Sequence, residues 1–251
     1  MSSIASINSN ISYGTIASGS KLNSAADGAS ELTIANKLES QSTGLQAGAS
    51  NAKAGNSVLN IADGALSGIQ DYLQRIRELS VKASSGLNSA SDLGSMQSEI
   101  SELMKGIQST ASGTEYNTMK ILDGSMASMD IATNPDGSGM QIKLANSTLE
   151  ALGIDGYDVT GDFDITRIDK ALDMVSSSRS SMGASSNALD YTYAYNTNTS
   201  QQLTGAQSSL EDLDIPQAIS EMKKNELLEE YKNSMLKAQM DQESVVTKLM
   251  L

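Results

Sequence analysis

The segment LNIADGALSGIQDYLQRIRELSVKASSG (Leu59–Gly86) places its larger apolar residues on one face of a helix. These residues follow one another mostly at intervals of three and four, and they are Leu59, Ala62, Leu66, Ile69, Leu73, Ile76 and Ala83. Such intervals are typical of a helix that packs one apolar stripe against other helices. The segment therefore predicts a long amphipathic helix at the centre of the fold.

Two further stretches carry a similar stripe. The first follows the break at SSGLNSASD, where Ser91 or Asp92 is predicted to cap a second helix because its oxygen can accept from the free amides of the first turn. The apolar positions of that helix are Leu93, Met96, Ile100, Leu103 and Ile107. The other stripe has a spacing of seven and consists of Ile168, Val175, Met182, Leu189, Asn196, Leu203 and Leu210. A helix containing all of these would be roughly 60 Å long, which suits a rod better than a globule.

We predict that these stripes form a seam along which long helices pack in an assembled rod. The predicted seam consists of Leu66, Ile69, Leu73, Ile76, Val175, Met182, Leu189, Leu203 and Leu210. Asn196 interrupts it with a polar side chain. This asparagine either selects one alignment of the paired helices or marks a place where the seam opens to water.

The middle of the chain has the pattern of β-strands instead of helices. MDIAT and MQIKL flank the turn NPDGSG, and apolar and polar residues alternate through MQIKL, so residues 119–164 are predicted to hold a β-hairpin. The acidic run Asp155–Asp164 lacks the ligand spacing of a calcium loop, and a solvated turn explains it better.

The segment that begins at Pro216 is an amphipathic tail with an apolar end. Its predicted contact residues are Ile219, Met222, Leu228, Tyr231, Val245, Val246 and Leu249. Exposed apolar residues of this kind usually require a partner.

Composition argues against several classes of function. A net charge of −13 argues against nucleic acid and against an anionic membrane surface as partners, and no apolar window is long enough to span a bilayer. Histidine and cysteine are absent, which removes the commonest catalytic pairs and most zinc sites. We therefore expect no enzyme activity, no catalytic residue, no metal and no cofactor. The N-terminus has no basic residue before Lys21 and no continuous apolar run, so no Sec-type signal peptide is expected.

The predicted fold is mostly α. The N- and C-terminal halves would form a long antiparallel helical bundle or coiled-coil rod, with a small central β-hairpin insertion. The predicted parts are residues 1–24 with 215–251 as a terminal coiled coil, 25–118 with 165–214 as a helical rod core, and 119–164 as the insertion.

Four stretches can be compared word by word with a known family. They are IASGSKLNSAADGASELTIANKL (Ile16–Leu38), the Leu59–Gly86 segment, EYNTMKILDG (Glu115–Gly124) and AQMDQESVVTKLML (Ala238–Leu251). Together they resemble bacterial flagellin across nearly the whole chain. The most specific word is LQRIREL, which resembles the family's Leu-Gln-Arg-Val-Arg-Glu-Leu.

In flagellins the two termini pair as helices that line the inner tube of the filament, and the long helices form a shell around it. The resemblance therefore implies a structural, self-assembling subunit of the bacterial flagellar filament that serves motility. It also implies export through the flagellar type III system to the extracellular flagellum. The implied partners are other copies of the chain, an export chaperone that binds the C-terminal helix, and the filament cap and junction proteins.

The LQRIREL word also supplies a candidate contact surface. By period alone, Gln74, Arg75, Glu78 and Leu79 point away from the apolar stripe, and a solvated face with weak ion pairs explains them as well as a recognition surface does. In flagellins this word lies between subunits of a protofilament and is bound by the vertebrate flagellin-sensing Toll-like receptor. The resemblance implies the same contacts here, together with Glu99 in MQSEI.

Some positions depart from the family pattern. Lys21 replaces an arginine, Asp27-Gly28 replaces a pair of acids, Glu243 replaces a proline, and the chain begins several helical turns later than typical flagellins. The alternatives are therefore a minor flagellin or hook–filament junction protein, or a secreted immune ligand or adhesin without a role in the main filament.

Overall fold

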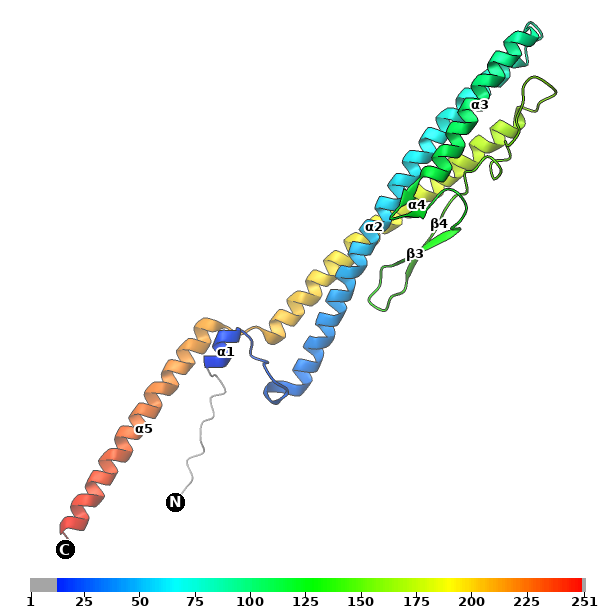
Figure 1. The fold of residues 1–251 in the computed structure, drawn as a ribbon. Coiled ribbons are helices and arrows are strands. Elements are labelled where there is room, and N and C mark those ends of the chain that lie inside the picture. Colours follow the sequence, from blue (N-terminus) through cyan, green and yellow to red (C-terminus); the bar gives the residue numbers. More distant parts are fainter. Residues whose placement is uncertain (1–12, 250–251) are drawn as a thin grey trace. The chain divides into compact units, whose positions relative to one another are not determined.

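The computed structural model describes the backbone of residues 13–249 and the side chains of residues 14–242 (Figure 1). Its elements in chain order are α1 (Tyr13–Ser18), α2 (Ala25–Ala83), α3 (Ala90–Gly113), β1 (Glu115–Tyr116), β2 (Met119–Lys120), β3 (Ser128–Ala132), β4 (Gly139–Lys143), α4 (Thr166–Glu211) and α5 (Ile215–Leu249). They form two compact units. The core unit is Gln41–Gln201, and the terminal unit is Met1–Ser40 with Gln202–Leu251. The predicted class, mostly α with long helices and a small β-hairpin, is confirmed.

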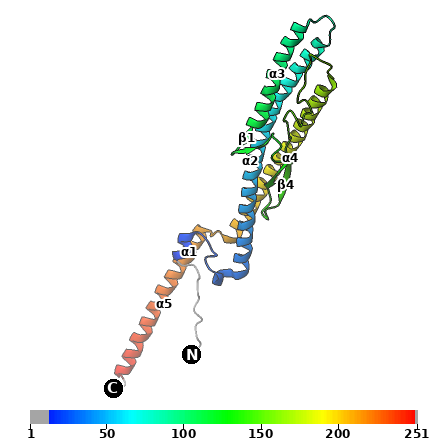
Figure 2. The same ribbon diagram turned by 45° about the vertical axis from the view of Figure 1, so that its right-hand side comes forward.

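In the core unit, α2, α3 and α4 run side by side (Figures 1 and 2). The apolar stripe of α2 lies between them, and Leu66, Ile69, Leu73 and Ile76 have no exposed surface. Each such side chain contributes about 1.5–3 kcal/mol through the area it removes from water. The stripe predicted from the period is therefore the core of this unit.

The turn between α2 and α3 is held by side chains at both helix ends. The Asn88 amide donates to the carbonyls of Lys82 and Ala83, at the C-terminal end of α2, and to that of Ser85, just after it. The N-cap of α3 is Ser89, whose hydroxyl accepts from the Asp92 amide, while the Asp92 carboxylate accepts from the Ser89 amide. The predicted cap, Ser91 or Asp92, was wrong by a few residues because a reciprocal capping box places the serine three residues before the acid.

Six aspartates each accept hydrogen bonds from a serine or threonine two or three residues away, and these bonds lower the pKa of each carboxyl below 3.8. They are Asp27, Asp92, Asp123, Asp136, Asp158 and Asp164. A carboxyl whose folded pKa is lowered stabilises the fold above its unfolded pKa, and this contribution is lost as the pH falls through the folded pKa. The melting temperature, followed by circular dichroism, should therefore be flat above about pH 5 and fall steadily below about pH 4. A melting temperature unchanged down to about pH 2 would contradict this assignment.

The predicted hairpin is present as antiparallel strands β3 and β4. Its turn contains Gly137 at φ +82°, a left-handed conformation that suits glycine. On β4, Ile142 is buried and Met140 half-buried, whereas Gln141 and Lys143 are exposed, as the alternation predicted. The apolar side of the hairpin packs against the helical core.

The hairpin is seated on glycines of α2. A Cβ atom at Gly44 would lie 2.6 Å from Pro135, and one at Gly48 would lie 2.1 Å from the Thr133 carbonyl oxygen, so only glycine permits this approach. From α4, the Asn196 amide donates to the same Thr133 oxygen at 2.7 Å. Asn196 is 1% exposed, so the seam does not open to water there. Instead, Asn196 fixes the hairpin against α4.

The segment between β4 and α4 alternates buried and exposed residues. Tyr157 and Val159 are buried, and Asp158 and Asp164 are exposed and bind the nearby Thr160 and Thr166. This confirms the prediction of a solvated acidic turn. The Tyr157 hydroxyl donates to Ser80 of α2 at 3.0 Å, and burial raises the pKa of Tyr157.

Candidate protein-interaction surface

Four side chains form an outward face on the core unit, which we call the Arg75 face: Gln74, Arg75 and Glu78 on α2, and Glu99 on α3. Arg75 bridges the two helices. Its Nη2 lies 2.7 Å from Glu99 Oε1, its Nε donates to the same oxygen at 2.8 Å, and its Nη1 lies 3.0 Å from Glu78 Oε2. The structure thus places Glu99, which the family resemblance implies as part of the contact surface, beside Arg75, and Arg75 also forms an i,i+3 ion pair with Glu78.

The charges of this face are only partly removed from water. The side chains of Arg75, Glu78 and Glu99 are 41%, 63% and 45% exposed. Hydrogen bonding to Glu99, and then to Glu78, raises the pKa of Arg75, so its guanidinium is charged at every physiological pH. Ion pairs this exposed contribute little to folding. They do hold the guanidinium in one orientation, which lowers the entropic cost of binding a partner.

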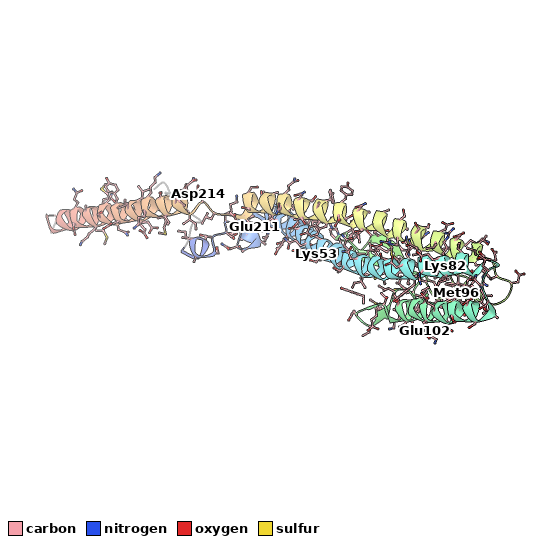
Figure 3. The ribbon with its side chains drawn as sticks, turned by 90° about the horizontal axis from the view of Figure 1, so that it is seen from above. Lys53, Lys82, Met96, Glu102, Glu211 and Asp214 are labelled. Carbon is pink, nitrogen blue, oxygen red and sulfur yellow. The ribbon has the colours of Figure 1, made fainter. Side chains whose placement is uncertain are left out.

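The same pattern continues one turn along α3, where Lys105 Nζ lies 2.7 Å from Glu102 Oε1. Figure 3 shows Glu102 and Met96 on α3, which runs beside the part of α2 that carries Lys82. Leu79 does not belong to this face. It is 3% exposed and lies in the apolar core, so its predicted outward position was wrong. The physical reason is that α2 packs against two helices, which bury two adjacent stripes instead of one.

The predicted assembly seam also requires correction. Its residues in the core unit are at most 2% exposed, and they are Leu66, Ile69, Leu73, Ile76, Val175, Met182 and Leu189. The chain's own helices cover them, so they stabilise the subunit and are not available to another copy. Leu203 and Leu210, in the terminal unit, are half-buried.

The apolar side chains of α5, unlike those of the core unit, are exposed. Ile219, Leu228 and Tyr231 are 39%, 49% and 65% exposed, and Met222 is half-buried. The side chains of the other predicted residues, Val245, Val246 and Leu249, lie outside the described residues. Among the α5 side chains that are described, only Ala218 is buried. These side chains do not share one face, because Ile219 and Leu228 are nine residues apart and therefore lie on opposite sides of the helix, so the predicted amphipathic face is wrong. An isolated helix that exposes large apolar side chains in this way requires a partner to cover them.

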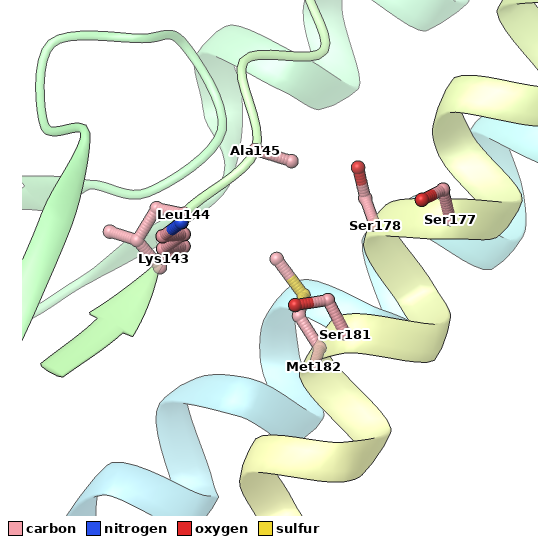
Figure 4. A pocket seen from close by; sticks show the side chains of 7 residues that line it. All are labelled: Lys143, Leu144, Ala145, Ser177, Ser178, Ser181 and Met182. Carbon is pink, nitrogen blue, oxygen red and sulfur yellow. The ribbon is translucent and has the colours of Figure 1, made fainter. Parts of the chain in front are cut away.

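A pocket of about 210 Å³ lies between the end of β4 and α4 (Figure 4), and its lining residues are Lys143, Leu144, Ala145, Ser177, Ser178, Ser181 and Met182. Serines and one lysine of this kind form no nucleophile–base pair in the pocket. Within residues 14–242, no cluster of three or more acidic side chains could hold a metal ion.

Across the described part of the chain, no helix is both long and apolar enough to cross a membrane.

Several links between α2 and α4 escaped sequence reasoning. Arg179 donates to both oxygens of Asp63 at 2.8 and 3.3 Å and to Gln70 at 2.8 Å, and Arg77 reaches Asp169 at 2.7 Å. These partners lie about a hundred residues apart in the sequence, so no local sequence pattern predicts the bonds between them. A signal did exist for the seat of the hairpin, because Gly44 and Gly48 are four residues apart in a predicted helix, where glycine is costly without a packing reason.

Comparison with known proteins decides the family. The model of the bacterial flagellin N-terminal helical region matches residues 2–127, and that of the C-terminal helical region matches residues 165–249. The chain belongs to the bacterial flagellin family. Flagellin of Bacillus subtilis strain 168 is 31% identical over 261 residues, covering 88% of this chain and 86% of its relative. Flagellin of Halalkalibacterium halodurans is 29% identical over 242 residues, covering 94% and 89%.

Solved structures agree with this flagellin's fold. The crystal structure of Bacillus cereus flagellin matches with a TM-score of 0.52 and 25% identity, covering 59% of this chain and 88% of that one. A protein described as flagellar hook-associated, from Vibrio parahaemolyticus, matches with a TM-score of 0.61 at 12% identity, covering 74% and 100%. The second likeness concerns the fold alone.

Proposed function

We propose that this flagellin is a structural subunit of the extracellular flagellar filament and that its terminal helices drive its self-assembly. The single observation that carries this proposal is the set of large apolar side chains that α5 exposes on all its sides. Covering these side chains removes apolar area from water, and this gain offsets the entropy lost when subunits and helices become ordered. Polymerisation then follows mass action on subunit concentration.

The same exposed side chains support the further partners that flagellins have. An export chaperone that covers α5 before assembly would keep its apolar side chains from aggregating. Export by the flagellar type III system, and contact with the filament cap and junction proteins, belong to the same proposal. The same proposal includes the division of the chain into three parts. They are a terminal coiled coil (1–24 with 215–251), a rod core (25–118 with 165–214) and an insertion (119–164). A structural role requires no catalysis.

We further propose that the Arg75 face is a protein contact used between neighbouring subunits and by the flagellin-sensing Toll-like receptor. Its support is an exposed guanidinium held rigidly by Glu78 and Glu99 where it adds little to folding. Arginines of this kind are frequent anchors of protein interfaces, because the planar fork binds with a defined geometry.

Arg75→Ala should lower receptor signalling in a cell reporter assay by about tenfold or more, since truncating an interface anchor typically costs 2 kcal/mol or more. The matched control is Arg77→Ala. Arg77 lies on the same helix with a side chain 49% exposed, but it pairs with Asp169 of α4. Equal responses from wild type and Arg75→Ala would reject the receptor contact.

A hook–filament junction protein is the second candidate, because the helical fold alone, which the chain shares with a protein described as flagellar hook-associated, does not separate the two roles. The two functions differ in assembly, because a junction protein is added in few copies. Electron microscopy of the purified chain in a kosmotropic salt separates them, since only a filament subunit should form long tubes. A secreted ligand or adhesin would likewise form no tubes.

A further inference from the structure

Within the core unit, a line of polar bonds joins α2 to α4 beside the apolar core, and we call it the polar ladder. Its positions on α2 are spaced by seven residues or twice seven, and they are Ser42, Asn56, Asp63, Gln70 and Arg77. The bonded partners on α4 follow in the reverse order of the sequence, and they are Ser200, Asp190 with Ser186, Arg179 (for both Asp63 and Gln70) and Asp169. The ladder therefore keeps the heptad interval of a coiled-coil contact.

The apolar stripes of the two helices do not by themselves fix one alignment. Buried apolar residues recur every seven residues on both helices, and they are Leu59, Leu66 and Leu73 on α2 and Val175, Met182 and Leu189 on α4. If α4 moved along α2 by seven residues, about 10 Å, apolar side chains would again meet apolar side chains. A preference for the observed alignment must therefore come from other groups.

The charges of the ladder distinguish the two alignments. In the structure Arg179 Nε lies 2.8 Å from Asp63 Oδ1, and Arg77 Nε lies 2.7 Å from Asp169 Oδ1. A shift of α4 by seven residues toward the C-terminus of α2 would instead bring Arg179 to Arg77. It would also bring Asp190 to Asp63, so like charges would meet at both places, and the opposite shift would part Arg77 from Asp169. Ion pairs this exposed add little stability, but repulsion in the alternative alignment provides specificity.

The β-hairpin depends on the same alignment. The Ala132 carbonyl accepts from the Asn51 amide of α2 at 2.8 Å, and the next carbonyl, that of Thr133, accepts from the Asn196 amide of α4 at 2.7 Å. Two consecutive carbonyls can meet both helices only where Asn51 and Asn196 lie at the same level. The hairpin can therefore dock only on helices in the observed register.

We propose that the polar ladder selects the register of α2 and α4 as the chain folds: it rejects an alignment, shifted by seven residues, that the apolar stripes alone would accept. Polar groups within an apolar helix contact can set its alignment at some cost in stability. A subunit in the shifted register could not dock its hairpin, and it would not present equivalent contacts in a polymer. The consequence for the polymer rests on the proposed self-assembly, whereas the register is a property of the single chain.

The chain contains no cysteine, so engineered cysteine pairs can report the register. With Ser200→Cys as the common partner, Ser42→Cys reports the observed register, because the two hydroxyl oxygens are 2.9 Å apart. Ala49→Cys and Ala35→Cys lie seven residues to either side of position 42, too far for a disulfide unless α4 shifts. Each chain is refolded from guanidinium in a thiol–disulfide buffer at low protein concentration, and mass spectrometry of its peptides measures which disulfide forms.

A ladder-free chain carries Asn56→Leu, Asp63→Leu and Arg179→Leu. In this chain the yield of the shifted disulfides should rise by about tenfold, while the melting temperature stays nearly unchanged, because apolar side chains replace paired polar ones. The matched control carries three leucines at exposed positions of the same helices outside the ladder, with the same net charge, and its changes are Lys53→Leu, Asn60→Leu and Asp173→Leu. The control should form only the observed disulfide.

A charge exchange, Asp63→Arg with Arg179→Asp, tests the direction of the shift. The ion pair of the observed register is kept, but both like-charge contacts of one shifted register become attractive. The disulfide of Ala49→Cys should therefore increase, and that of Ala35→Cys should not.

Formation of only the observed disulfide in the ladder-free chain would overturn the proposal. So would a large fall of its melting temperature with an unchanged register, because the ladder would then supply stability alone. A wild-type chain that forms no polymer, although its reporter pair forms the observed disulfide, would instead overturn the proposed function and leave register selection in place.

Discussion

Gly48→Val should detach the β-hairpin from the long helices and lower the free energy of unfolding by about 3–5 kcal/mol. A Cβ at this position would lie 2.1 Å from the Thr133 carbonyl oxygen and 2.9 Å from Asn196 Nδ2. The backbone of the hairpin turn must then move, which breaks the bond between Asn196 and Thr133 and leaves a buried amide without an acceptor. For a unit of this size the melting temperature should fall by roughly 10 °C.

Thermal unfolding followed by circular dichroism measures this effect, and Gly64→Val is its matched control. Gly64 lies on the same helix, and a Cβ there meets nothing within 4 Å. In an open helical position, replacing glycine should be neutral or slightly stabilising. If both variants melted alike, the glycine seat would have no role in holding the hairpin.

The second large effect concerns assembly. Introducing Leu228→Glu together with Tyr231→Glu should abolish polymerisation and leave the melting temperature unchanged. Both side chains lie on α5 and are largely exposed, so the charges disturb no packing within the subunit. In the polymer, each would bring an unpaired carboxylate into an apolar contact, which costs several kcal/mol per group.

Sedimentation of polymer from monomer measures this loss. The control chain carries Asn233→Glu and Gln239→Glu, which add the same charge to α5 at exposed polar positions. Loss of polymer in both chains would assign the effect to charge alone. Normal polymer from the Leu228 and Tyr231 variant would show that α5 is not an assembly surface.

Most of the helical fold could be predicted from the sequence, because apolar residues at intervals of three, four and seven report directly which side of a helix is covered. The hairpin was also predictable, since its turn residues and its alternation are local. The prediction of one apolar stripe on α2 left out part of its buried surface. With α3 on one side and α4 on the other, a second line of residues that includes Leu79 is buried as well.

The candidate surface could be predicted only in part. Arg75, Glu78 and Glu99 carry charge at positions that the stripe leaves free, and the family resemblance names them. Contacts between residues that are far apart in the sequence could not be predicted. Asn196 remained ambiguous because its partner, Thr133, belongs to the hairpin, 63 residues earlier in the sequence.

Electron microscopy of the purified wild-type chain, at rising concentration in ammonium sulfate and seeded with its own fragments, tests the central claim most directly. A filament subunit driven by its apolar termini should form long tubes above a critical concentration that falls as the salt increases. Monomers or short oligomers at every concentration, with intact helix content, would contradict it.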